Sequence, residues 1–141
     1  MCYLFDVLPT LGKLCDVRAP QGSDGIEFSA TLRDPARPAR REMMFAYKKV
    51  QRAFRDERWK LIRYPQVDKT QLFDLQTDPQ EVTNLAYLPQ YAAKVAELTA
   101  RLQKEQQKSG DAEPLTVAHP KAAGWTPPAK NFDPKKIKAI D

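Results

Sequence analysis

The chain has 141 residues, of which 42% are hydrophobic and 29% charged, and its 23 basic and 18 acidic side chains give a formal net charge of +5. This length predicts one modest globular unit with a working but small core. No apolar run approaches the roughly 18 residues of a membrane-spanning helix, and residues 1–15 lack the basic region and the small-residue cleavage site of a signal peptide.

The N-terminal segment predicts a short helix over residues 3–15. Asp6 stands at its start as a candidate cap, and Pro9 suits its first turn. The segment is too short to bury all of its large apolar side chains by itself, so we expect them to be exposed. They are Leu4, Phe5, Leu8, Leu11 and Leu14. Residues 16–40, punctuated by prolines and glycines, predict a linker.

Four short segments predict an antiparallel sheet, arranged as a meander. They cover residues 43–47, 51–55, 58–64 and 70–75. Asp56 and Glu57 separate the second from the third segment and predict a hairpin turn that lacks the favoured glycine. Because side chains alternate along a strand, the third segment has two faces. One carries Trp59 and Leu61, and the other carries Lys60, Ile62 and Tyr64.

Residues 89–108 predict the longest helix. Its apolar residues recur at spacings of four and three and form one stripe, made of Tyr91, Val95, Leu98 and Leu102. Gly110 suits the end of the helix. Beyond Asp111, prolines recur without periodicity and predict a tail that wraps extended over the body or stays mobile, with Trp125 as a candidate anchor.

The expected fold class is α+β: a small four-stranded antiparallel sheet packed against one C-terminal helix, with a short N-terminal helix and an extended proline-rich tail. Residues 1–40 are expected to hold the N-terminal helix and linker, residues 41–110 the α+β subdomain, and residues 111–141 the tail. Six apolar residues are expected to be buried together between sheet and helix. They are Trp59, Leu61, Leu72, Leu75, Leu98 and Leu102.

Short motifs follow one another along the first 85 residues. They are Asp6-Val7-Leu8-Pro9-Thr10-Leu11, Asp24-Gly25, Gln51-Arg52-Ala53, Arg58-Trp59-Lys60-Leu61-Ile62, Leu72-Phe73-Asp74-Leu75, Asp78-Pro79-Gln80-Glu81 and Asn84-Leu85. In this order they resemble the C-terminal subdomain of type I sulfatases, such as arylsulfatases and N-sulfoglucosamine sulfohydrolase-like enzymes, over roughly residues 3–110. The resemblance implies a non-catalytic part of a sulfuric ester hydrolase. Such a part packs on the catalytic domain and shapes the pocket for a sulfated carbohydrate or an aryl sulfate.

The catalytic features of that family are missing from the sequence. Sulfatases make a formylglycine from the first residue of a C/S-x-P-x-R motif, and neither Cys2, Cys15 nor any serine opens such a motif here. The resemblance therefore implies that the catalytic domain is absent and that this chain alone is inactive. Calcium and formylglycine are expected in a complete member, which would be exported to the periplasm, the extracellular space or a lysosome. The cysteines fit free thiols or a pair.

The resemblance also places a candidate substrate-binding rim at the strand that precedes the Arg58–Ile62 motif. The residues are Tyr47, Lys48, Gln51 and Arg52. Gln51 suits a hydrogen bond to a sugar hydroxyl, while Lys48 and Arg52 suit a carboxylate or a second sulfate. The alternative for each residue is a solvent-facing position on the sheet without a ligand.

Two other functions stay open at the level of sequence. The positive charge is concentrated in residues 40–64, which hold nine basic and three acidic side chains interleaved with aromatic residues. This pattern fits a solvated strand face, a rim that attracts an anionic substrate, or a weak nucleic-acid-binding module. A stand-alone interaction domain, with possible self-association through the N-terminal helix, is the other alternative. His119 has no metal ligands at suitable spacing and is expected in a surface loop.

Overall fold

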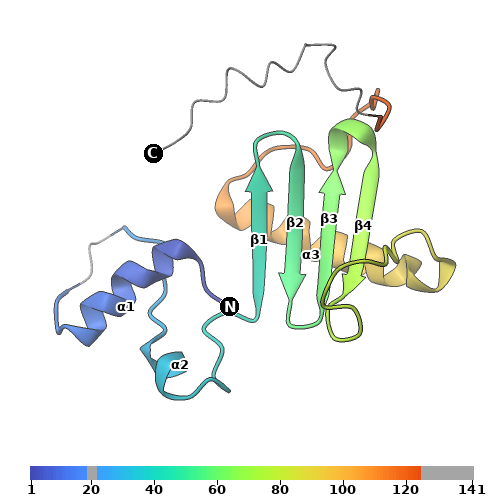
Figure 1. Ribbon diagram of the computed structural model, residues 1–141. Helices are drawn as coiled ribbons and strands as arrows, with labels where there is room; N and C mark the ends of the chain where they lie inside the picture. Colours follow the sequence, from blue (N-terminus) through green and yellow to red (C-terminus); the bar gives the residue numbers. More distant parts are fainter. Residues whose placement is uncertain (19–21, 125–141) are drawn as a thin grey trace, which may run out of the picture.

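The computed structural model describes residues 1–18 and 22–124. Figure 1 shows the arrangement of its helices and strands. The helices are α1 (Val7–Leu14), α2 (Ser29–Arg33) and α3 (Ala92–Ser109), and the strands are β1 (Glu42–Tyr47), β2 (Gln51–Asp56), β3 (Trp59–Tyr64) and β4 (Lys69–Asp74). Single 3₁₀ turns precede α1, α3 and β4, at Leu4–Asp6, Pro89–Tyr91 and Pro65–Val67. The predicted α+β class is confirmed. Helix α2, which lies in the predicted linker, was not anticipated.

The four strands form one antiparallel sheet in the order β1-β2-β3-β4, which is the predicted meander. The turn between β2 and β3 has no glycine and is held by a side chain instead. Asp56 Oδ1 accepts hydrogen bonds from the backbone N–H groups of Arg58 and Trp59, at 3.0 and 2.7 Å. An aspartate that satisfies two turn amides explains how the hairpin closes without the favoured residue.

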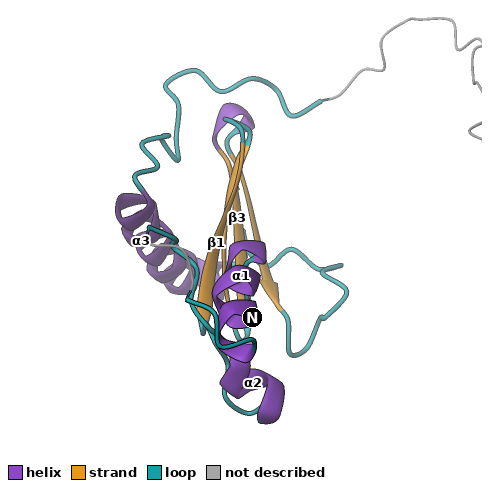
Figure 2. Ribbon diagram, turned by 90° about the vertical axis from the view of Figure 1, so that its left-hand side faces the viewer, coloured by secondary structure: helices purple, strands orange, loops and turns teal. Residues whose placement is uncertain are grey.

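Helix α3 covers one face of the sheet, as the edge-on view in Figure 2 shows. The core between them consists of fully buried residues from β2, β3, β4 and α3, namely Phe54, Leu61, Leu72, Leu98 and Leu102. Leu115 of the C-terminal segment, which is 8% exposed, packs into the same core. The predicted stripe of α3 is confirmed, because Tyr91 and Val95 pack against the same cluster. Trp59 is half-buried beside it.

The prediction that Leu75 belongs to this core is wrong. Leu75 packs against a second, smaller cluster on the opposite face of the sheet, formed by Ala53, Ile62 and Phe73. The reason is the period of two along β4, which places Leu72 on the helix side and Phe73 and Leu75 on the other. Among the residues that the structure describes, no helix covers that face (Figure 2).

The C-terminal segment runs back along the sheet after α3 ends. Gly110 terminates the helix with φ 70°, in the left-handed region that favours glycine. Leu115 then enters the core, its carbonyl oxygen accepts a hydrogen bond from Arg63 Nε at 2.9 Å, and Lys121 N–H donates to Gln66 O at 2.7 Å. Trp125 lies outside the described residues. No helix in the described part of the chain is long and apolar enough to cross a membrane.

Candidate functional site

The N-terminal segment, residues 3–15, buries two polar side chains. Asp6 and Thr10 are buried, at 0% and 3% exposure, whereas the apolar residues around them face outward. Asp6 precedes α1 as predicted, but its side chain caps none of the backbone N–H groups of α1, and its Oδ2 instead accepts from Tyr3 N–H at 2.7 Å. It accepts hydrogen bonds from Arg40 Nε and Nη2 at 2.8 and 2.6 Å and from Ile26 N–H at 2.9 Å. The Arg40 guanidinium lowers the pKa of Asp6 to about 2.

Thr10 and Gly25 complete this attachment of residues 24–28 to α1. Thr10 Oγ1 donates to the carbonyl oxygen of Asp6 at 2.7 Å and accepts from Phe28 N–H at 3.0 Å. A side chain at Gly25 would place its Cβ 2.3 Å from the carbonyl oxygen of Phe5, so only glycine fits this approach. The Asp24-Gly25 motif therefore marks a backbone contact rather than a ligand site.

The outward side of the N-terminal segment is a patch of exposed apolar residues, which we call the α1 patch. It consists of Leu4, Phe5, Val7, Leu8, Leu11 and Leu14. Helix α1, which carries most of the patch, lies beyond the β1 edge of the sheet (Figure 1). The segment is tied to that edge by the Tyr3 hydroxyl, which donates to Met44 O at 2.8 Å and accepts from Met44 N–H at 2.7 Å. Nothing among the described residues covers the patch. Contiguous apolar surface of this kind marks an interaction site.

The structure brings the four predicted rim residues to one turn, between β1 and β2. Tyr47 and Gln51 pair across the two strands, Tyr47 is 57% exposed, and Lys48 occupies the turn. Lys48 has φ 47°, a left-handed conformation that is strained for a residue other than glycine. Its Nζ lies 5.7 Å from the centre of the Tyr47 ring. Tyr47 and Gln51 share the face of the sheet that α3 leaves open, since alternate residues along a strand share a face.

Arg52 lies in the same turn but faces the other side. It is 4% exposed, and its Nε and Nη2 donate to the two carboxylate oxygens of Asp111 at 2.5 and 2.9 Å. Its Nη1 donates to the carbonyl oxygens of Lys48 and Gln51 at 2.5 and 2.9 Å. Arg52 therefore holds the backbone of the turn. Sequence reasoning missed Asp111, because no local pattern relates it to Arg52.

Much of the basic segment is neutralised within the chain. Six of its nine basic side chains form ion pairs with residues elsewhere in the chain. The pairs are Arg40–Asp6, Lys49–Glu113, Arg52–Asp111, Arg58–Asp74, Lys60–Glu81 and Arg63–Asp68. A nucleic-acid surface needs many cations that are free to contact phosphates. The geometry therefore favours a folded, internally paired strand region with a few remaining cations, such as Lys48.

The described residues do not provide a metal site. No group of three or more His, Cys, Asp or Glu side chains comes together within residues 1–18 and 22–124. Three of the best-buried carboxylates are each occupied by an arginine, at Asp6, Asp74 and Asp111. His119 is exposed, and Cys2 and Cys15 are free and exposed. This donor set does not fit a calcium site, which needs six to eight oxygen ligands.

Comparison with known proteins identifies the family. The family model described as N-sulphoglucosamine sulphohydrolase, C-terminal, matches residues 1–108. Among solved structures, the chain is similar to BT1596, a 2-O GAG sulfatase, with 31% identity and a TM-score of 0.64 over 75% of this chain and 25% of that one. It is also similar to a putative sulfatase from Bacteroides thetaiotaomicron VPI-5482, with 30% identity and a TM-score of 0.64 over 75% and 25% of the two chains.

A third similar structure is BT4656 in complex with its substrate D-glucosamine-2-N,6-O-disulfate. Here the identity is 24% and the TM-score 0.65, over 76% of this chain and 24% of that one, which shows a common fold. No curated protein matches significantly. The chain spans about a quarter of the length of these three proteins. The family match covers α1, the sheet and nearly all of α3. The chain belongs to the family of N-sulphoglucosamine sulphohydrolase C-terminal domains.

Proposed function

We propose that this chain acts as the non-catalytic C-terminal subdomain of a sulfatase, packing on a catalytic domain through the α1 patch. One observation carries the proposal: the N-terminal segment buries Asp6 and Thr10 and exposes its leucines. If solvent were the only neighbour of this side of the segment, burying the leucines and exposing the polar residues would be more stable. Burial of each leucine side chain contributes about 1.5–3 kcal/mol. The family match includes this segment, which supports treating it as part of the subdomain.

In this arrangement the β1–β2 turn forms part of the substrate pocket. The Lys48 ammonium pairs with a sulfate or carboxylate group of the substrate, and the Gln51 carboxamide hydrogen-bonds a hydroxyl group. Tyr47 offers an exposed ring at the same edge. Arg52 acts as a positioning residue, because its bonds to the Lys48 and Gln51 carbonyl oxygens fix the turn. The residues of this chain therefore bind and orient.

The proposed substrate class is a sulfated saccharide rather than an aryl sulfate. Two of the similar structures are described by sulfated sugars: one as a 2-O GAG sulfatase and one with bound D-glucosamine-2-N,6-O-disulfate. A complete sulfatase cleaves the ester with a formylglycine and a calcium ion. In the proposal both groups belong to the catalytic domain, in keeping with the sequence, which lacks the formylglycine motif.

Co-expression tests the proposal. The full chain is produced together with the catalytic part of the 2-O GAG sulfatase BT1596, shortened by the quarter that this chain matches. We expect the two parts to co-purify and to hydrolyse a 2-O-sulfated disaccharide. Leu8→Asp should abolish co-purification because it places a charge in an apolar interface. Val82→Asp, at a residue that is 79% exposed in the loop after β4, is the matched control. Co-purification that survives Leu8→Asp would contradict the proposal.

The rim is tested in the same assembly. Lys48→Gln is expected to raise KM by about three- to tenfold while leaving kcat nearly unchanged, since it removes a contact made equally to substrate and transition state. Lys49→Gln is the control, because Lys49 neighbours Lys48 but pairs with Glu113 at 3.4 Å. Equal effects of the two variants would contradict a specific role for Lys48.

A further inference from the structure

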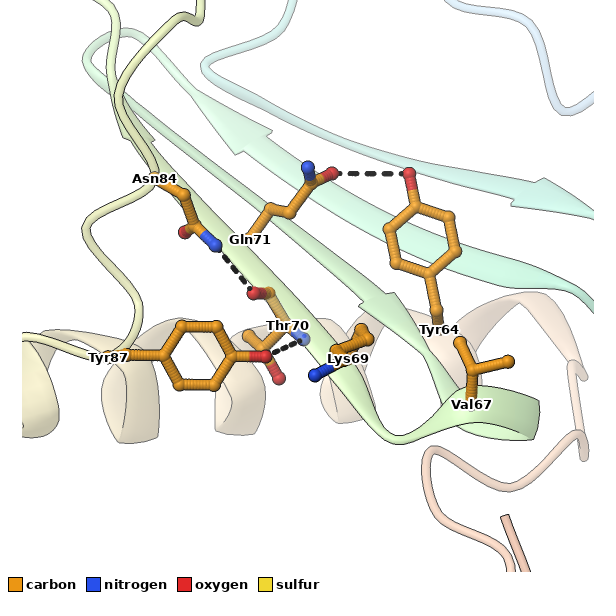
Figure 3. A pocket seen from close by; sticks show the side chains of 7 residues that line it. All are labelled: Tyr64, Val67, Lys69, Thr70, Gln71, Asn84 and Tyr87. Atoms are coloured by element: carbon orange, nitrogen blue, oxygen red, sulfur yellow. Dashed lines mark hydrogen bonds between the residues drawn. The ribbon is translucent and has the colours of Figure 1, made fainter. Parts of the chain in front are cut away.

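A hollow of about 280 Å³ lies at the outer edge of β4, where the loop after the sheet folds back beside the strand. Figure 3 shows the side chains that line it, which come from the end of β3, the 3₁₀ turn at Pro65–Val67, the start of β4 and the loop after β4. They are Tyr64, Val67, Lys69, Thr70, Gln71, Asn84 and Tyr87. Tyr64, Lys69 and Gln71 lie on the face that α3 leaves open, as their pairing in β3 and β4 requires.

The wall of the hollow is held in place by hydrogen bonds along β4. Asn84 Oδ1 accepts from Leu72 N–H at 3.0 Å, and Asn84 Nδ2 donates to Thr70 O at 3.1 Å. The Tyr87 hydroxyl accepts from Thr70 N–H at 3.2 Å, so its ring stands against the strand (Figure 3). The Tyr64 hydroxyl donates to Gln71 Oε1 at 3.2 Å. Two aromatic rings are therefore fixed on either side of Gln71.

Several binding groups in the hollow keep unused hydrogen-bonding capacity. The Tyr87 hydroxyl accepts from the backbone and retains its own proton, and the Gln71 NH₂ group makes no hydrogen bond within the described residues. Lys69 has no carboxylate partner there either, whereas Lys60 of β3 is paired with Glu81. The Lys69 Nζ lies 6.0 Å from the centre of the Tyr87 ring. Tyr87 is 63% exposed, so its ring is accessible.

We propose that this hollow is a second sugar site, which binds one ring of a sulfated or carboxylated saccharide. The rings of Tyr64 and Tyr87 contact the carbon face of the sugar, the Gln71 amide and the Tyr87 hydroxyl donate to its oxygens, and Lys69 pairs with the anionic group. Pockets for drug-sized ligands have volumes of about 300–1,000 Å³. The hollow, at about 280 Å³, is slightly smaller, which suits a single sugar ring. The choice of a sulfated sugar rests on the proposed function.

The position of the hollow suits a longer chain that also reaches the rim. Tyr47 pairs with Gln51 and Tyr64 pairs with Lys69, and both pairs lie at the same end of the sheet on the open face (Figure 1). From β1 to β4 there are three strand spacings, or about 14 Å, which is the length of a short oligosaccharide rather than of one sugar. The hollow therefore takes a sugar that is not the one being desulfated.

The test is an NMR titration of the full, isotope-labelled chain with three probes: D-glucosamine-2-N,6-O-disulfate, unsulfated glucosamine and inorganic sulfate. We expect saturable shifts of the Gln71 side-chain amide and the Lys69 and Tyr87 backbone amides with the sulfated sugar alone. Lys69→Gln should weaken this binding about three- to tenfold. Lys104→Gln, the same charge change at an exposed position of α3, should leave it unchanged. Tyr87→Ala should abolish it.

Three results would overturn the site. They are the absence of saturable shifts, equal shifts with inorganic sulfate, which would show an anion site only, and equal weakening by Lys104→Gln and Lys69→Gln. If Tyr87→Ala does not fold, the comparison of Lys69→Gln with Lys104→Gln tests the site without it. The titration needs no catalytic domain, so its failure is distinguishable from failure of the proposed function. Shifts at the β1–β2 turn without shifts in the hollow would overturn only this second site.

Discussion

Residues 41–124 and residues 1–40 differ in which side chains they bury. The sheet and α3 bury Phe54, Leu61 and Leu98 completely, whereas the N-terminal segment buries Asp6 and exposes Leu4, which is 89% accessible. The first region is a complete hydrophobic core. The second is held together by buried polar and charged contacts of Asp6 and Thr10, and its large apolar side chains are exposed. The contrast shows that the sheet and α3 form a hydrophobic core by themselves, whereas the N-terminal segment, among the described residues, does not.

The largest effect should come from breaking the buried ion pair in the complete region. Asp111→Ala leaves Arg52 buried and unpaired, so we expect a loss of about 3–5 kcal/mol in the free energy of unfolding. Urea denaturation measures it. The control, Glu97→Ala, removes an exposed carboxylate that pairs with Lys94 and, at 3.5 Å, with Arg101, and it should cost less than about 1 kcal/mol. Similar costs for both variants would show that Arg52 is not held as described.

A pair of leucine variants sharpens the contrast between the two regions. Leu98→Ala should cost about 2–5 kcal/mol, because it opens a cavity in a fully buried core. Leu8→Ala, in the α1 patch, should change the free energy of unfolding by less than about 0.5 kcal/mol, because Leu8 is already 53% exposed and lies outside the buried core. A large cost for Leu8→Ala would mean that α1 belongs to the chain's own core.

Acid should loosen the N-terminal segment first. The pKa of Asp6 lies at about 2 when it is paired with Arg40, below its ordinary value of 3.8. A lowered folded-state pKa contributes stability above the ordinary value, and this is lost as the pH falls from about 4 through about 2. This contribution, about 2 kcal/mol, opposes local opening of the N-terminal segment and does not add to the stability of the core between the sheet and α3. The backbone amide shifts of Ile26 and Phe28 should report the transition, and Asp6→Asn should remove it. A midpoint near 3.8 would contradict the pairing.

The smallest effect on stability should follow removal of α1. A chain that starts at Gln21 loses the α1 patch, the Asp6–Arg40 ion pair, the Tyr3 bonds to Met44 and the contacts with residues 24–28, but no residue of the core. We expect it to be more monomeric than the full chain by light scattering, with a free energy of unfolding within about 0.5 kcal/mol. If the full chain is a clean monomer and the shortened chain unfolds, the N-terminal segment is part of the core, and the stand-alone alternative gains support.

The sheet and α3 were predictable because their signals are local. Alternation defines β3, and the stripe at Val95, Leu98 and Leu102 defines the buried side of α3. The pairs Asp6–Arg40 and Arg52–Asp111 were not predictable, since they join residues 34 and 59 positions apart. Asp6 has the sequence features of a helix cap, and only the fold shows that it is a buried partner instead.

The candidate rim was predictable in part. The family resemblance placed Tyr47, Lys48, Gln51 and Arg52 together, and the structure does bring all four to one turn. The direction of Arg52 follows from strand alternation, which sets it on the opposite face from Gln51. The hollow at Tyr64 and Tyr87 was not anticipated, because its wall depends on the loop after β4 folding back along the strand.

Native-state hydrogen exchange tests the contrast between the two regions most directly. In the isolated chain, amides of β2, β3 and α3 should exchange only by global unfolding, while those of α1 should exchange far faster by local opening. Adding the shortened BT1596 catalytic part should slow exchange in α1 selectively. If α1 amides were as protected as those of β3 in the isolated chain, the N-terminal segment would be complete by itself and the proposed interface would be contradicted.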